Sequence, residues 1–243
     1  MTKPNFLFLG PSKTASTYLY KMLLQHPCFS LPSTKDIYYF DQFYMKGDDW
    51  YINHFKNCDN SKIIGEFSHD YICNQVALSR ILSFDKTLKL IVCLRNPYLR
   101  TESGIKFLRR NGYGFEELSI LINNYPELIE GSLYGKNLSY LLSIFSSNNI
   151  LLLDFDDLLL DPRIFLKKVY NFFGVSEFYP DNIYSVINKA KQARHPSISY
   201  MAKHFALKIR RYGFNTIPLY LSFPYNNISR SLQPITCLSI TME

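Results

Sequence analysis

The sequence predicts an α/β domain in which a parallel, doubly wound sheet is flanked by helices. Four short apolar runs carry no polar alternation, which is typical of strands buried on both faces of a sheet. Longer segments with helical spacing separate these runs, and strands that alternate with helices in this way are expected to run parallel. Each run ends at a turn residue or a charge, and the expected strands span residues 5–9, 62–65, 89–94 and 149–155.

Six helices are expected between and after these strands. The first begins at a Ser-Thr pair after Gly10, the third begins at Pro97, and the last follows Asp161-Pro162, since proline fits the first turn of a helix. The expected helices span residues 16–25, 76–84, 97–110, 115–123, 137–145 and 163–173.

The segment after Gly174 has a weaker pattern. A loop is expected first, then a basic helix over residues 197–211, whereas the segment from Phe214 onward, which three prolines interrupt, has no predicted structure. Neither an internal repeat nor a linker divides the chain. Residues 1–243 are therefore expected to form a single domain.

The composition indicates a folded protein with an anionic partner. Hydrophobic residues make up 47% of the 243 residues and charged residues only 19%, which excludes a disordered chain. The formal net charge is +7, and such an excess of lysine and arginine favours anionic ligands. The sequence has no long basic run. Its two arginine pairs, Arg109-Arg110 and Arg210-Arg211, are too short to form a nucleic-acid-binding segment. A small polyanion is the expected partner, and nucleic acid is not.

Cysteine spacing and hydropathy bear on cofactors and location. The five cysteines form no CxxC motif and have no histidine at metal-ligand spacing, so neither a zinc site nor a disulfide framework is expected. The apolar stretch at the start of the chain is too short for a secretion signal, and no uncharged span reaches the length of a membrane helix. The expectation is a soluble, cytoplasmic protein without a transmembrane segment.

The stretch GPSKTAST, residues 10–17, lies where the first strand passes into the first helix. Parallel sheets bind ligands at the carboxyl ends of their strands, where the following helix offers free N–H groups to an anion. The stretch does not match a Walker A loop, because Lys13 lies in the middle of the turn, and a GxGxxG fingerprint is absent. Two interpretations stay open: an anion site that uses Lys13, Ser16 and Thr17, or a plain turn with Ser16 as the N-cap.

A second candidate site is LRNPYLRTES, residues 94–103, directly after the strand at 89–94. An arginine at the end of a strand and a serine on the helix that follows can hold one phosphate through bidentate and hydroxyl hydrogen bonds. The alternative is an exposed ion pair for Arg95 and an exposed Ser103. Arg100 is expected to be solvated.

Together with KDIYYFD (residues 35–41) and GEFSHDY (residues 65–71), these motifs resemble the PAPS-dependent sulfotransferases, especially the heparan sulfate sulfotransferase type and its bacterial relatives. The resemblance runs from about residue 6 to residue 174. It implies a P-loop-kinase-like sulfotransferase fold and an enzyme of the EC 2.8.2 type. The implied sulfuryl donor is 3′-phosphoadenosine 5′-phosphosulfate (PAPS), the product is 3′,5′-diphosphoadenosine (PAP), and no metal is required. The acceptor would carry a hydroxyl or an amine, as a glycan, lipid or small molecule.

The resemblance also implies how the donor is bound. Lys13 would stabilise charge as the sulfuryl group leaves, Arg95 and Ser103 would hold the 3′-phosphate, and Lys191 and Arg194 would contact the nucleotide phosphates. The cradle for the 5′-phosphosulfate would consist of Lys13, Thr14, Ala15, Ser16 and Thr17. Relatives usually carry glycine where this chain has Ala15. The methyl group of alanine is small, and we expect the turn to persist if Ala15 keeps right-handed backbone angles.

Three residues are candidates for the catalytic base. Asp36 matches the position of a glutamate in the KE..FF motif of the relatives, although its side chain is one methylene shorter. Glu66 and His69 are the alternatives, and His69 follows the end of a strand, where site residues collect. His69 can also be a local hydrogen-bonding residue, and Asp36 a solvated carboxylate. Asp36 is the favoured base, and Glu66 and His69 stay open as alternatives.

Two other functions are compatible with the same scaffold. A P-loop nucleotide kinase would share the fold and the opening turn, but the missing Gly-Lys-Ser/Thr and the absence of an evident magnesium carboxylate beside the turn disfavour it. A non-catalytic nucleotide- or glycan-binding domain is the second alternative, because Asp36 and Phe67 depart from the pattern of the relatives.

Overall fold

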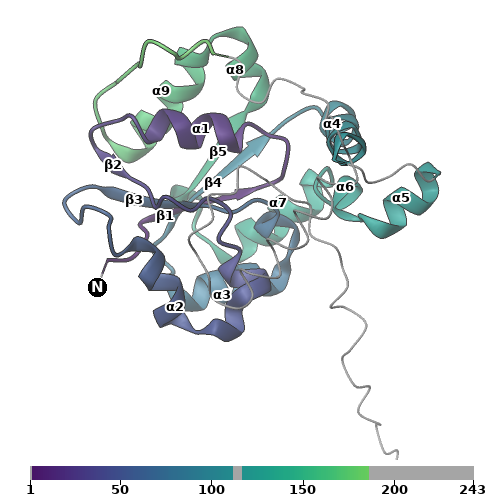
Figure 1. Ribbon diagram of the computed structural model, residues 1–243, viewed down its shortest axis with the longest axis horizontal. Coiled ribbons are helices and arrows are strands. Elements are labelled where there is room, and N and C mark those ends of the chain that lie inside the picture. Colours follow the sequence, from purple (N-terminus) through teal and green to yellow (C-terminus); the bar gives the residue numbers. More distant parts are fainter. Residues whose placement is uncertain (1, 112–116, 186–243) are drawn as a thin grey trace, which may run out of the picture.

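A computed structural model describes residues 2–111 and 117–185, which form a five-stranded parallel sheet with helices on both faces (Figure 1). The strand order is β2-β3-β1-β4-β5, and this arrangement confirms the predicted doubly wound α/β fold. The two-residue strand β2 was not predicted. The strands are β1 (Phe6–Gly10), β2 (Phe29–Ser30), β3 (Ile63–Phe67), β4 (Lys89–Leu94) and β5 (Ile150–Asp154).

The strand order places the functional loops together. The central strand β1 pairs with β3 on one side and with β4 on the other, and all three run in the same direction. In this type of sheet, ligands bind where neighbouring strands connect to opposite faces. The residues that follow β1, β3 and β4 therefore meet at one edge of the sheet.

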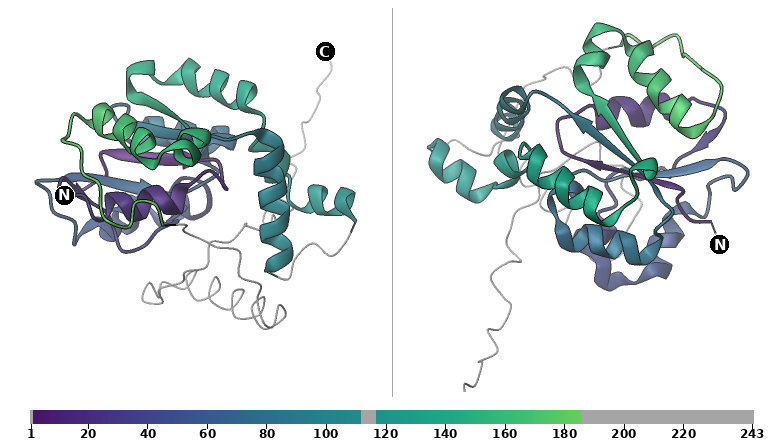
Figure 2. Two further views of the ribbon diagram at one scale, coloured as in Figure 1. Left: turned by 90° about the horizontal axis from the view of Figure 1, so that it is seen from above. Right: turned by 180° about the vertical axis from the view of Figure 1, so that it is seen from behind.

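Helices cover the two faces of the sheet in two groups, as Figures 1 and 2 show. Leu7 and Leu9 face one apolar core and Phe6 and Phe8 face the other, because successive side chains of a strand point to opposite faces. One face is covered by α1 (Ser16–Leu23), α8 (Phe155–Leu160) and α9 (Pro162–Phe173), and the other by α2 (Asp48–Ile52), α3 (Gln75–Phe84) and α7 (Tyr134–Ile144).

Three further helices stand beside the sheet rather than over it (Figure 2). These are α4 (Pro97–Arg110), α5 (Leu118–Asn124) and α6 (Glu127–Glu130). Asn96 caps α4 by accepting hydrogen bonds from the first-turn N–H groups, and Pro97 occupies its first turn. The three helices share a small apolar core, made by Leu108, Leu121, Tyr125 and Leu128, and they form one wall of the site described below.

Short helical turns complete the part of the chain that the structure describes. They are η1 (Tyr39–Phe43), a π-helix, and the 3₁₀ turns η2 (Tyr44–Lys46), η3 (Asn53–Phe55), η4 (Tyr71–Cys73) and η5 (Ser147–Asn149). The expected strand at 149–155 ends at Asp154, whose carboxylate accepts a hydrogen bond from the Asp156 N–H and so caps α8. Helices α2, α6 and α8 were not predicted, since each is only four to six residues long.

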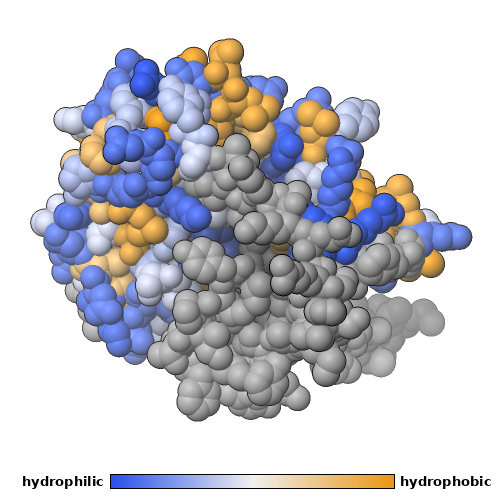
Figure 3. All heavy atoms as spheres, turned by 45° about the horizontal axis from the view of Figure 1, so that its top comes forward, coloured by the Kyte–Doolittle hydropathy of each residue, from blue (hydrophilic) through white to orange (hydrophobic). Residues whose placement is uncertain are grey.

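Some expectations fall outside the described ranges. The basic helix at 197–211 lies beyond residue 185, and the start of the helix expected at 115–123 lies in the gap at 112–116. A single domain over residues 1–243 stays a prediction. Within residues 2–111 and 117–185, no helix has the length and apolar content needed to cross a membrane. Figure 3 shows hydrophobic residues in separate patches among hydrophilic ones on the part of this face that is coloured.

Candidate active site

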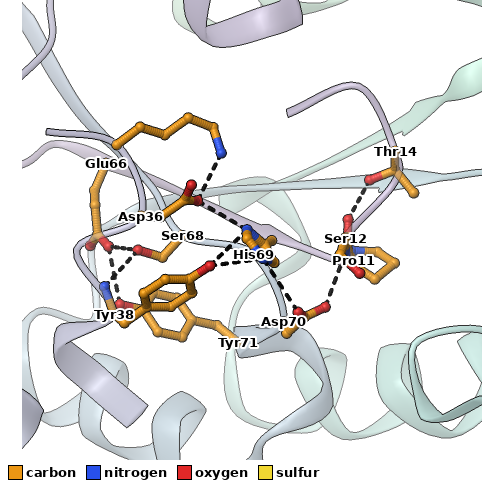
Figure 4. A network of polar contacts seen from close by, with 11 residues as sticks. Pro11, Ser12, Thr14, Asp36, Tyr38, Glu66, Ser68, His69, Asp70 and Tyr71 are labelled. Atoms are coloured by element: carbon orange, nitrogen blue, oxygen red, sulfur yellow. Dashed lines mark hydrogen bonds and ion pairs between the residues drawn. The ribbon is translucent and has the colours of Figure 1, made fainter. Parts of the chain in front are cut away.

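The loop after β1 is held against the loop after β3 by a close backbone approach. Gly10 has a φ of 99°, and a Cβ atom there would lie 2.6 Å from the backbone nitrogen of Asp70. Only glycine fits this position. The Asp70 carboxylate then accepts a hydrogen bond of 3.0 Å from the Ser12 N–H, so the ends of two neighbouring strands are joined (Figure 4).

The loop delivers free N–H groups at the start of α1. Thr14 is buried, and its hydroxyl donates to the carbonyl of Pro11 at 2.6 Å, which fixes the turn internally. Helix α1 starts at Ser16, and the cap position is Ala15, which has no side chain that accepts a hydrogen bond. The interpretation of Ser16 as the N-cap is therefore wrong. An uncapped first turn presents N–H groups and the positive end of the helix dipole to an anion.

Ala15 departs from the conformation expected for it. Its φ is 67° and its ψ is 12°, in the left-handed region. The condition of right-handed angles is therefore not met, and the left-handed conformation gives a physical reason why glycine is usual at this position in the relatives. A non-glycine residue in this region costs about 1 kcal/mol or more, so the turn keeps its form under backbone strain.

Replacing Ala15 with glycine should therefore stabilise the protein. We expect Ala15→Gly to raise the free energy of unfolding by about 0.5 to 1 kcal/mol, because relief of the strain outweighs the entropy that glycine adds to the unfolded chain. Chemical denaturation measures this change. The matched control is Ala77→Gly in α3, where Ala77 is buried in an ordinary helix and the same change should lower stability by about 1 kcal/mol. Equal losses in both variants would contradict the strain at Ala15.

Lys13 is a half-buried cation that forms no ion pair among the described residues. Its Nζ lies 4.1 Å from the centre of the Phe107 ring, and no ion pair joins it to an acidic side chain in residues 2–111 or 117–185. Burial and the positive charges of Arg110, Arg95 and Lys35 together lower the pKa of Lys13 to about 8, although the charge of Asp70 opposes the fall. A desolvated cation among other cations is electrostatically unfavourable, and an anionic ligand would relieve this.

Arg95 lies directly after β4 and contacts the same loop. Its Nη1 donates to the carbonyl of Lys13 at 3.0 Å, and its guanidinium lies 4.3 Å from the centre of the Phe155 ring. The Nε atom is buried and has no hydrogen-bond partner among the described residues. Ser103 lies on α4, two turns beyond Arg95, and is half-buried. The structure thus brings Lys13 and Arg95 together and leaves Arg95 with an unused donor.

Arg100 is not solvated, contrary to the expectation from the sequence. It is 1% exposed, and its guanidinium donates to the Ser132 hydroxyl and to the carbonyls of Ser12, Glu127 and Leu128. The Arg100 guanidinium thus donates hydrogen bonds both to the loop after β1 and to α6. Arg100 therefore ties the wall made by α4 and α6 to the opening turn.

Asp36 and His69 form a buried pair at the end of β3 (Figure 4). Asp36 Oδ1 lies 2.9 Å from His69 Nδ1 and accepts a hydrogen bond of 2.7 Å from Lys35 Nζ. In the neutral imidazole, this contact places the proton on Nδ1 and leaves Nε2 to accept from the Tyr38 hydroxyl at 2.8 Å. The arrangement is that of a histidine base oriented by a carboxylate.

The two members of this pair have opposite pKa shifts. Burial acts to raise the pKa of Asp36, but the charges of Lys35 and His69 outweigh it and hold this pKa well below its usual range. Burial acts to lower the pKa of His69, but the carboxylates of Asp36 and Asp70 outweigh it and raise this pKa above its ordinary value. Asp36 is therefore a very weak base, and the imidazole is the stronger one.

The backbone around this pair is strained. Asp36, Tyr38 and Asp70 all have φ between 55° and 75°, which costs about 1–3 kcal/mol for each residue. The Asp36 N–H donates to the Phe67 carbonyl at 2.8 Å, and the Tyr38 N–H donates to the Ser68 hydroxyl at 3.0 Å. These contacts hold the segment against β3 and fix the direction of the Asp36 carboxylate.

Glu66 lies on β3, three residues before His69, and is 1% exposed. Its carboxylate accepts hydrogen bonds from Ser68, from Tyr51 at 2.6 Å and from Tyr71 at 3.0 Å. Burial raises the pKa of Glu66, although the three hydroxyl donors oppose the rise. Glu66 does not line the cleft, so this carboxylate suits an internal anchor for Ser68, Tyr51 and Tyr71, of which Figure 4 shows Ser68 and Tyr71.

A cleft joins these groups. Its walls are the loop after β1, the loop after β3, and helices α4 and α6. Of the candidate residues, Lys13, Ser16, Thr17 and His69 line it, whereas Thr14, Asp36 and Glu66 are buried behind it. Arg95 is half-buried and contacts the Lys13 carbonyl. Ser12, Lys35, Asp70, Gly104, Phe107, Leu108, Glu127 and Leu128 complete the lining. Lys191 and Arg194 lie outside the described residues.

Three residues of the site were not anticipated from the sequence. Arg100 precedes Gly104 and Leu108 at helical spacing, and this pattern would have placed it on the buried face of α4. Phe107 lies one residue from that face and gives no clear signal. Glu127 follows Pro126 in the first turn of α6, where an acidic residue is an ordinary helix-start feature.

Several known proteins are similar in sequence to this chain. A family model for the sulfotransferase domain matches residues 3–204. The membrane-associated sulfotransferase kil1 of Dictyostelium discoideum is 35% identical over 144 residues, which are 54% of this chain and 30% of that protein. Bifunctional heparan sulfate N-deacetylase/N-sulfotransferase 4 of Mus musculus is 29% identical over 202 residues, 72% of this chain and 23% of that protein. The chain spans less than a third of the length of these two relatives.

Solved structures show the same fold. A sulfotransferase from Alicyclobacillus acidocaldarius superimposes with a TM-score of 0.68 at 21% identity, over 87% of this chain and 94% of that one. The mouse sulfotransferase SULT7A1, complexed with PAP, superimposes with a TM-score of 0.52 at 15% identity, over 74% of this chain and 61% of that one. These superpositions confirm the fold that the motifs led us to expect.

Proposed function

Because the chain belongs to the sulfotransferase domain family, we propose that it transfers a sulfuryl group from PAPS to a hydroxyl or amine of an acceptor. The observation that carries this proposal is Lys13, a half-buried cation that lies beside an uncapped helix start and forms no ion pair among the described residues. A function as a P-loop nucleotide kinase has no comparable support, since the opening turn lacks the Gly-Lys-Ser/Thr sequence that these kinases use.

The residues present fit this donor. The donor supplies the activated sulfuryl group and two further anionic groups. Lys13, Ser16, Thr17 and the first-turn N–H groups of α1 would bind the 5′-phosphosulfate, and Thr14 and Ala15 would shape the turn. Arg95, whose Nε lacks a partner among the described residues, would hold the 3′-phosphate together with Ser103.

We propose His69 as the general base, with Asp36 as the residue that orients it. His69 lines the cleft and Asp36 does not, and the low pKa of Asp36 makes this carboxylate a poor proton acceptor. The acceptor's oxygen or nitrogen would form the bond to sulfur and pass its proton to His69 Nε2, where the acceptor would take the place of the Tyr38 hydroxyl that donates to this nitrogen. The electron pair of the broken S–O bond would stay on the phosphate oxygen, whose charge Lys13 would stabilise. Glu66 would act as an anchor rather than as the base.

Thermal shift measurements with PAP, and with ATP plus Mg²⁺, test the donor assignment. We expect PAP to raise the melting temperature more than ATP with Mg²⁺ does, because only PAP carries a 3′-phosphate for Arg95. Arg95→Ala should weaken PAP binding about 10- to 100-fold, since hydrogen bonds to a charged group are lost. Arg163→Ala, at an exposed position on α9, is the matched control and should bind PAP normally. Stabilisation by ATP with Mg²⁺ alone would favour a kinase.

Two parts of the interpretation stay predictions. Contact of Lys191 and Arg194 with the nucleotide depends on residues outside the described ranges. A cytoplasmic location is a prediction as well, because one relative, kil1, is named as membrane-associated.

A further inference from the structure

The lining of the cleft divides by charge. Lys13 lies at the opening turn, and Arg95 and Arg110 are close enough to lower its pKa. The carboxylates of Asp70 and Glu127 also line the cleft, together with His69. The cations suit the anionic donor of the proposed function, on which this inference rests. The carboxylates, in contrast, would repel that donor, so they call for another ligand.

Glu127 is the least satisfied of these carboxylates. Its Oε1 atom is buried and has no hydrogen-bond partner among the described residues. Arg100 does not satisfy this oxygen, since its Nη2 donates a hydrogen bond of 3.1 Å to the backbone carbonyl of Glu127 instead. A buried carboxylate oxygen without a donor is costly. A ligand that donates hydrogen bonds in the cleft would remove this cost.

Asp70 lines the same cleft as Glu127, and its negative charge acts on the Glu127 carboxylate. One Asp70 oxygen accepts from the Ser12 N–H, and the other lies 3.7 Å from His69 Nε2. Burial is the main cause that raises the pKa of Glu127 to about 7. The charges of Asp70 and Glu130 contribute to this rise, whereas the residue's own backbone hydrogen bond and the charge of His69 oppose it. Lys35, the nearest lysine of the loop before η1, is already paired with Asp36. Neither carboxylate forms an ion pair with a lysine or arginine among the described residues, although the charge of Asp70 acts on Lys13. Two carboxylates that line one cleft in this way favour a cation between them.

We propose that Glu127, with Asp70 beside it, binds a protonated amino group of the acceptor and makes the cleft selective for amino alcohols. An ammonium ion held by carboxylates has no free electron pair with which to attack sulfur. The group presented to His69 is therefore a neighbouring hydroxyl of the same molecule. Glu127 is a specificity-determining residue, and His69 remains the base.

Binding of small probes to PAP-loaded protein tests this proposal. The probes are trans-2-aminocyclohexanol and cyclohexanol, which differ only in the amino group, and NMR line broadening measures their dissociation constants. We expect the amino alcohol to bind at least about tenfold more tightly than cyclohexanol, since a hydrogen bond to a charged group has about this effect. Glu127→Gln, which keeps the shape of the side chain, should abolish this preference.

Glu130→Gln is the matched control, because Glu130 lies on the same helix and does not line the cleft. This variant should keep the preference for the amino alcohol. In the parent protein the preference should also grow as the pH rises through about 7, when Glu127 loses its proton, and Glu127→Gln should lose that part of the pH dependence.

Failure of this inference is distinguishable from failure of the proposed function. PAP binding is measured in the same samples, and loss of PAP binding in the parent protein would count against the sulfotransferase assignment. Normal PAP binding with no preference for the amino alcohol, or with a preference that survives Glu127→Gln, would overturn the role of Glu127 alone.

Discussion

Lys13→Ala is expected to lower the turnover number by about 100- to 1,000-fold, which is the usual effect of removing one group that stabilises charge in a transition state. The cation lies in the cleft beside the uncapped start of α1, and no carboxylate of the described residues forms an ion pair with it. Loss of this cation leaves the departing phosphate oxygen without its nearest charge. Transfer from a sulfur-35-labelled donor, with an acceptor found by screening amino alcohols, measures the loss.

Folding is expected to tolerate this substitution. Lys13 is desolvated and surrounded by positive charge, so its removal should leave the melting temperature unchanged or raise it. Lys106→Ala is the matched control, because Lys106 makes an exposed ion pair with Glu102 on α4 and its loss should leave turnover unaffected. An unfolded Lys13→Ala protein, or one with near-normal turnover, would contradict the proposed role of Lys13.

The pKa of Lys13 adds a pH dependence to this prediction. With a pKa of about 8 in the free protein, the side chain loses its charge as the pH rises through that value. We therefore expect kcat/KM to fall above about pH 8. At saturating donor the fall in kcat should begin at higher pH, because the negative charge of the donor raises the pKa of Lys13. Lys13→Arg, which keeps its charge, should lose this alkaline limb.

The sequence predicted those parts of the site that depend on local pattern. Gly10, Lys13 and Arg95 lie at the ends of apolar strands, and a parallel sheet gathers such positions at one edge. The role of Arg100 and the place of Glu127 depend on packing between α4, α6 and the opening turn. Contacts of this kind join residues far apart in the chain. Hydrophobic periodicity can place Arg100 on the buried face of α4, but it does not identify the groups that Arg100 contacts.

Backbone conformation was the other feature that the sequence did not reveal. Ala15, Asp36 and Tyr38 all have positive φ, although none is glycine. Propensity rules place such residues in ordinary regions. The surrounding hydrogen bonds, such as that from the Asp36 N–H to the Phe67 carbonyl, hold these angles instead. Concentration of strain around the cleft agrees with its proposed role as the site of chemistry.

Substitutions at His69 and Asp36 are expected to separate the base from its orienting partner. His69→Ala should lower the turnover number by about 100- to 10,000-fold, the range for loss of a general base. The parent protein should gain activity as the pH rises through the pKa of His69, because only the neutral imidazole accepts a proton. That pKa is raised by the carboxylates of Asp36 and Asp70, and this acid limb should be absent from His69→Ala.

Asp36→Asn gives the decisive comparison. It removes the negative charge that raises the pKa of His69, so the acid limb should move to lower pH while turnover falls by about 10- to 100-fold through the lost charged hydrogen bond. Asp85→Asn, which breaks an exposed pair with Lys3, is the control and should leave the profile unchanged. If Asp36 were itself the base, Asp36→Asn would remove the limb rather than shift it. The direction of the shift therefore decides which member of the pair accepts the proton.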